Sequence, residues 1–235
     1  MKTRFLLVAM AVVTASCSVY HPQSVDIPLV DHKGELRVDL ATSVSTVVFL
    51  PDVVNINTTF TYAATGWLAG QLHANYGGDN YYVQAAPGLY KPIGKRFVLE
   101  SYFGAGYGGV NHTKQTTNDS RHNYMGSYLL PFAQVNAGWR HLGAFELGFG
   151  MKVGAFMPKL DYYRYNNAEP PEVTAEEHYS NTNLLLEPQL QIRVGSESLM
   201  FTLRVGYAFL DRLNDETQNL NHDYLTLSAG LGFSF

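Results

Sequence analysis

Apolar and polar residues alternate with a period of two from Glu35 to the end of the chain. This period is typical of β-strands, whose successive side chains point to opposite faces of a sheet. In the clearest run, every second residue from Phe145 to Val153 is apolar, and Glu, Gly, Gly and Lys lie between them. Ten runs predict ten strands, with eight as the alternative, at about 35–44, 54–62, 68–76, 81–89, 97–107, 124–139, 145–153, 184–192, 201–209 and 225–235.

The two faces of these runs differ in composition. One carries Val, Leu, Ile, Phe and Tyr, and the other carries mostly Gly, Ser, Thr, Gln and Asn with a few charges. A soluble barrel would show many more charges on its water-facing side. Small polar residues suit a crowded interior, and an apolar face with aromatic ends suits lipid. The pattern predicts an all-β, closed, antiparallel up-and-down transmembrane β-barrel. Leu130 and Phe132 deviate, because they fall on a polar face.

The last run carries the most specific motif. It alternates without a break from Leu225 and ends on Leu231, Phe233 and Phe235. This pattern resembles the C-terminal signature of outer-membrane barrel proteins of Gram-negative bacteria, which the barrel-assembly machinery reads as a strand. The resemblance to small barrels of this kind extends over residues 35–235, and it rests on the pattern of residue types and not on sequence identity. It implies an outer-membrane location and contact with that machinery during biogenesis.

The connections between the runs indicate an orientation. Short joins at 64–66, 91–95, 140–143 and 195–198 contrast with longer, polar joins at 110–123, 158–181 and 211–223. We expect short and long joins to alternate strictly from the second strand on, as periplasmic turns and extracellular loops do. Both chain termini are then predicted to lie in the periplasm.

Residues 1–16 predict an export signal. Lys2 and Arg4 precede an apolar run from Phe5 to Val13. This run is too short to remain in a bilayer as a spanning helix, so its removal is expected.

The residues that follow the signal predict a lipid anchor. Thr14-Ala15-Ser16-Cys17 resembles the lipobox of bacterial lipoproteins in the looser form of the Bacteroidota; the strict pattern has Leu in place of Thr14. The resemblance implies that Cys17, the only cysteine, is acylated and begins the mature chain, after contact with the lipoprotein-export machinery. An ordinary signal cleaved near Ala15 is the alternative. Residues 17–34, with two prolines, are predicted to be a lipid-anchored periplasmic tether, and residues 35–235 the barrel domain.

Composition narrows the function further. Charged residues make up 15% of the chain, below the roughly 25% of an average soluble domain, and aromatics reach 13%. The net charge of −4 without a basic stripe argues against nucleic acid. The chain has no P-loop, GxGxxG or CxxC pattern. We therefore expect no cofactor, no metal and no catalytic residue.

Six charged side chains fall on the polar faces and are predicted to point into the barrel. They are Glu100, Glu146, Lys152, Glu187, Arg193 and Arg204. A lone buried charge is costly, so we expect a paired network that fills a narrow barrel, with Glu187 near the two arginines. A polar lumen that conducts or binds a ligand is the alternative.

Histidines supply the other candidate chemistry. Four of them, His112, His122, His178 and His222, fall in the predicted extracellular loops. We expect them to be solvated. The alternative is a rim site, since the ten-stranded omptin proteases use acidic residues and a His at the rim, and His222-Asp223 loosely resembles that. His73 with a serine would suggest a lipid A deacylase, but no Ser-His-acid order stands out.

The sequence therefore predicts a non-enzymatic outer-membrane lipoprotein, with a structural role or a role as accessory subunit of a larger envelope complex. Outer-membrane lipid is its expected partner. The alternatives are an enzyme with a rim active site, acting on lipid A or on peptides, and a narrow channel.

Overall fold

The computed structural model describes residues 20–46, 53–116, 120–140, 142–166, 171–196, 198–212 and 222–235. No helix in these ranges is long and apolar enough to cross a membrane. They form twelve strands: β1 (Leu36–Thr46), β2 (Val53–Ala63), β3 (Leu68–Gly77), β4 (Asn80–Ile93), β5 (Phe97–Thr116), β6 (Ser120–Trp139), β7 (Phe145–Tyr165), β8 (Val173–Tyr179), β9 (Asn183–Gly195), β10 (Leu199–Tyr207), β11 (Phe209–Arg212) and β12 (Leu225–Ser234).

Ten of these strands close into an antiparallel barrel, so the predicted fold class is confirmed, with ten strands rather than eight. Each strand from β1 to β7 pairs with its neighbour in sequence, β7 pairs with β9, and β12 returns to β1. The two remaining strands are short continuations. β8 pairs with the outer part of β7, and β11 extends the line of β10 along β9.

The two faces of the sheet are as the alternation predicts. Buried and exposed residues alternate along β3 and along β4 as far as Lys91. Exposed positions are large and apolar, such as Ile56 at 63% and Phe103 at 58%, while the buried positions between them are mostly polar. Exposed Trp67 and Trp139 lie near one end of the strands, and exposed Tyr76 near the other. This arrangement matches an apolar band with aromatic girdles.

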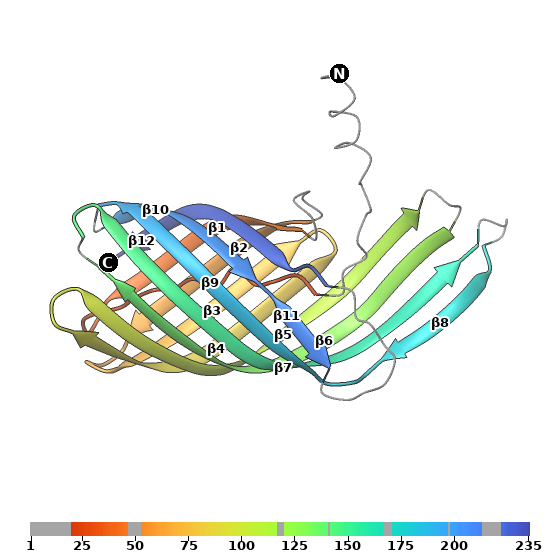
Figure 1. Cartoon of the computed structure of the whole chain (residues 1–235), viewed down its shortest axis with the longest axis horizontal. Coiled ribbons are helices and arrows are strands. Elements are labelled where there is room, and N and C mark those ends of the chain that lie inside the picture. Colours follow the sequence, from red (N-terminus) through yellow and green to blue (C-terminus); the bar gives the residue numbers. More distant parts are fainter. Residues whose placement is uncertain are drawn as a thin grey trace, which may run out of the picture.

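The barrel has two distinct ends (Figure 1). At the short-turn end, short connections join β2 to β3, β4 to β5, β6 to β7 and β9 to β10. The C-terminus lies there too, since Leu36 and Phe235 exchange backbone hydrogen bonds of 3.1 and 2.9 Å at the start of β1. At the opposite, long-hairpin end, the hairpins β5–β6 and β7–β8 project beyond the barrel.

The structure corrects the predicted connections at the long-hairpin end. The predicted loops 110–123 and 158–181 are mostly strand, because the β5–β6 and β6–β7 ladders continue into them. An antiparallel ladder can extend beyond lipid, where both faces meet water. β7 has 21 residues, about twice the 9–11 needed to cross a bilayer. The strict alternation of joins is also wrong, since only two residues separate β3 from β4 at this end.

A second correction concerns the predicted tether. Residues 20–31, which we call the luminal segment, lie inside the barrel (Figure 1). Tyr20, Ile27, Leu29 and Val30 are each 0% exposed. The sequence suggested a free linker because the segment has no period, but the barrel supplies partners for its backbone and its side chains. Cys17 and the predicted signal lie outside the described residues, so their roles stay predictions.

Candidate functional site

The six charged residues predicted for the interior all lie there. They sit at inward positions of β5, β7, β9 and β10, and each is between 1% and 6% exposed. Their partners differ in part from the prediction. Lys152 lies opposite Glu187 in the β7–β9 ladder, and their charged atoms are 3.6 Å apart. Arg193 lies opposite Glu146, at 3.2 Å, so it does not pair with Glu187.

The inward side chains bind the backbone of the luminal segment. Gln191 makes two bonds to one residue: its Oε1 accepts from Ile27 N at 3.1 Å, and its Nε2 donates to Ile27 O at 2.7 Å. Other contacts are Gln23 N to Glu187 (3.1 Å), Gln71 to Asp26 O (3.2 Å), Arg193 to Pro28 O (3.2 Å), Arg140 to Leu29 O (2.9 Å) and Val30 N to Glu100 (2.8 Å). The inward side chains therefore provide hydrogen-bond partners for the backbone of the luminal segment, much as a neighbouring strand would.

Asp26 forms the charged centre of the segment. Its carboxylate accepts from Arg193 and, at 2.7 Å, from Arg204. Arg204 also reaches Asp39 of β1 at 2.5 Å. All four side chains are at most 4% exposed. The two arginines of β9 and β10 thus face a carboxylate that comes from outside the strands, which the strand pattern alone does not reveal.

A second charged group closes the short-turn end. Arg37 binds Glu146 through both terminal nitrogens, at 3.0 and 3.1 Å, and donates to Glu35 at 2.8 Å. Arg140 contacts Glu35 at 3.0 Å and Glu146 at 3.1 Å. Glu35 is therefore shared by two arginines, and Glu146 by three, since Arg193 also contacts it. Such mutual pairing offsets the desolvation of the buried charges.

Glycines of the barrel wall make room for the apolar side chains of the segment. A Cβ at Gly148 would lie 2.9 Å from Ile27 Cγ2, and one at Gly150 would lie 3.1 Å from Ile27 Cδ1. A Cβ at Gly138 would lie 2.6 Å from Leu29 Cδ1. Side chains at these inward positions would displace the segment, so the glycines form sockets for Ile27 and Leu29.

An aromatic cluster closes the lumen towards the long-hairpin end. The ring centroid of Tyr20 lies 5.2 Å from that of Phe156 and 5.8 Å from that of Tyr128. Tyr82, Leu130, Leu185 and Ala208 complete the cluster, and all seven residues are at most 4% exposed. The Tyr20 hydroxyl donates to Glu187 at 2.8 Å. Leu130 is a buried member of this cluster. Its contact with the cluster explains an apolar residue on a polar face.

Little space remains in the lumen. One cavity beside Asp26 and Arg193 and another beside Lys152 and Glu187 each have a volume of about 10 Å³. Each is about the size of a single water molecule. The described part of the barrel therefore shows a plugged lumen rather than an open bore.

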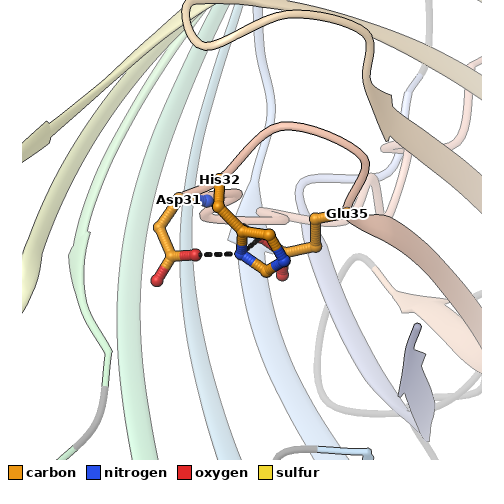
Figure 2. A group of neighbouring side chains, drawn as sticks. All are labelled: Asp31, His32 and Glu35. Carbon is orange, nitrogen blue, oxygen red and sulfur yellow. Dashed lines mark hydrogen bonds and ion pairs between the residues drawn. The ribbon is translucent and has the colours of Figure 1, made fainter.

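Asp31, His32 and Glu35 bring one possible metal ligand each within 4.8 Å at the short-turn end (Figure 2). Arg140 contacts both carboxylates at 3.0 Å, and Asp31 accepts a bond from His32 at 2.7 Å. A guanidinium already occupies the place that a cation would take. The cluster is better described as part of the charged network.

The structure corrects the predicted placement of the loop histidines. His112 lies on β5 and bonds Asp79 at 2.7 Å, and His122 lies on β6 and bonds Tyr162 at 2.7 Å. His178 lies on β8, where its hydrogen bond to Asp161 at 2.6 Å raises the pKa of the imidazole. His222 is only 6% exposed, and its backbone forms an isolated parallel β-bridge with that of Tyr20.

The groups considered for catalysis are occupied by structural contacts. Asp223, 0% exposed, binds His21 Nδ1 at 2.5 Å, and its backbone N donates to Tyr20 O at 3.1 Å. His73 lies in the lumen and bonds Thr59 at 2.9 Å. Leu231 and Phe233 of the predicted C-terminal signature lie on β12, and Phe235 follows its last residue; Leu231 is 45% and Phe235 is 74% exposed.

No protein-family model matches the chain, and no curated protein sequence matches it. Solved structures are similar to it. The outer membrane protease OmpT from Escherichia coli is 8% identical with a TM-score of 0.55, over 86% of this chain and 97% of that chain. The translocator domain of the autotransporter NalP from Neisseria meningitidis is 10% identical with a TM-score of 0.45, over 86% and 88%. The likeness to OmpT is one of fold alone.

Proposed function

We propose that this protein is a sealed outer-membrane barrel with a non-enzymatic role, as a structural element or as an accessory subunit of an envelope complex. The observation that supports it is the filled lumen. The luminal segment lies within the ten strands, and its backbone is held by side chains from β3, β5 and β9. A channel needs a continuous water path, and the two luminal cavities beside Asp26 and Lys152, of about 10 Å³ each, do not provide one.

The charged network supports the same function. Buried charges of both signs lie within contact distance of one another, and the arginines share carboxylates. Removing one partner of such a group is strongly destabilising. We infer that these residues serve the integrity of the barrel, which suits a protein that stabilises the envelope or presents its projecting hairpins to a neighbouring subunit.

Conductance tests the sealed barrel. Purified full-length protein is incorporated into planar lipid bilayers, with a general porin as the positive control. We expect no steady single-channel conductance from the wild-type protein. Steady conductance that scales with the amount of incorporated protein would overturn the proposal in favour of a channel.

Enzyme activity at the rim is tested separately. Purified protein is incubated with lipid A and with unstructured peptides, and products are identified by mass spectrometry. We expect none, because His21 and Tyr20 of the luminal segment both bind Asp223. Product that disappears in a folded His222→Ala variant would overturn the non-enzymatic role.

A further inference from the structure

The luminal segment crosses the barrel from one end to the other. At its C-terminal side, Asp31 N donates to Glu35 Oε2 at 2.9 Å, beside the start of β1 at the short-turn end. At its N-terminal side, Tyr20 O accepts from Asp223 N at 3.1 Å, just before β12 begins at the long-hairpin end. The first and last residues of the segment therefore lie at opposite ends.

The length of the segment agrees with a full crossing. Ten residue steps separate Tyr20 from Val30, and a fully extended chain covers at most about 33–36 Å in that distance. The apolar band of an outer-membrane barrel is about 25 Å tall. The contacts of the segment are spread along this distance, from Glu187 near Tyr20 to Glu100 near Val30.

The two ends differ in the features that set the orientation of outer-membrane barrels. Such barrels have short turns on the periplasmic side and longer connections on the outside. Here the C-terminus and the short turns share one end, and β5 to β8 project from the other. The long-hairpin end, where Tyr20 lies, is therefore the end that faces outward.

We propose that the chain threads its own barrel, so that the residues before Tyr20 leave it on the cell surface, on the opposite side from the C-terminus. This inference rests on the proposed outer-membrane function. It replaces the periplasmic N-terminus that the sequence predicts. The point of exit at Tyr20 then lies on the same side of the membrane as the projecting hairpins β5–β6 and β7–β8.

The threading has a consequence for the predicted lipid. Three residue steps separate Cys17 from Tyr20, so their Cα atoms are at most about 11 Å apart. An acyl group on Cys17 would enter the outer leaflet, and not the inner leaflet. Acyl chains do not fit through cavities of about 10 Å³, so the barrel must close around the segment during assembly.

Epitope tags test the direction of threading. One tag is placed between Ser18 and Val19, a second between residues 168 and 169 in the sequence that connects β7 to β8, and a third after Gly94 in a short turn. Antibody binding is compared on intact cells and on cells with a permeabilised outer membrane. Heat-modifiable mobility in electrophoresis shows that each tagged barrel is folded.

We expect the first and second tags to be labelled on intact cells and the third only after permeabilisation. If the first tag needs permeabilisation, as the third does, while the second is labelled on intact cells, the threading is overturned. If only the third tag is labelled on intact cells, the barrel is inverted and the surface exit is overturned. If the protein shows no conductance in planar bilayers, either of these results overturns the threading alone and leaves the sealed-barrel function supported.

A smaller probe guards against disturbance by the tag. Val19→Cys should react with a membrane-impermeant maleimide on intact cells, whereas Lys95→Cys in a short turn should react only after permeabilisation. The wild-type protein is the control for any reaction of the maleimide with Cys17 itself. Reaction of both variants only after permeabilisation would overturn the proposal.

Discussion

Replacing Asp26 by Asn tests the buried luminal segment most directly. Asp26 is 1% exposed and its carboxylate accepts hydrogen bonds from Arg193 and Arg204. Asparagine keeps the shape of the side chain but removes the negative charge between the two guanidinium groups. In a free periplasmic tether the same residue would be solvated, and the substitution would be nearly silent.

The expected magnitude follows from the remaining partners. Breaking a buried ion pair by removing one partner costs about 3–5 kcal/mol. Arg193 keeps Glu146 at 3.2 Å, and Arg204 keeps Asp39 at 2.5 Å, so neither guanidinium is left alone. We therefore expect the free energy of unfolding to fall by about 3 kcal/mol, at the lower end of this range.

The measurement is denaturant unfolding of the purified barrel in detergent micelles, followed by the fluorescence of Trp67 and Trp139. Asp31→Asn is the matched control on the same segment. Asp31 is 22% exposed, and its partner Arg140 keeps Glu35 and Glu146, so we expect a loss of less than about 1 kcal/mol. A change within about 0.5 kcal/mol for Asp26→Asn, typical of a surface substitution, would refute the buried segment.

Three further predictions follow from the same structure. Cys17→Ala should lose the label of a metabolic fatty-acid probe that marks the wild-type protein; equal labelling of both would contradict the lipid anchor. Leu203→Arg should cost about 2–4 kcal/mol in barrel stability, because Leu203 is 48% exposed on the lipid face, whereas Thr226→Ser should stay within about 0.5 kcal/mol of the wild type. Gly148→Val should destabilise by about 1–3 kcal/mol, because its side chain meets Ile27. The second substitution Ile27→Ala should recover part of that loss in the same unfolding assay, and additive losses would argue against the socket.

The sequence determined the barrel because strand pairing depends on a repeated local signal. Alternation predicts ten strands, and the small polar residues of one face indicate which face is inside. The same signal predicted that Glu146 and Arg193 point inward. For Leu130 and Phe132, which are apolar residues on the polar face, the alternation offered no explanation. The structure supplies one, since Leu130 belongs to the same buried cluster as Tyr20, and Phe132 to the same buried cluster as Val30.

The tertiary structure decided what fills the barrel and which charges pair. Residues 20–31 have no periodicity, and the side chains that hold them are distant in sequence: Gln191 binds Ile27 across 164 positions. The pairing of Arg193 with Glu146, and not with Glu187, depends on the register of β7 against β9. The side of the barrel on which the luminal segment begins depends on closure of all ten strands around it. Local patterns determine strands and faces, whereas the contents of the lumen depend on contacts that exist only after the barrel closes.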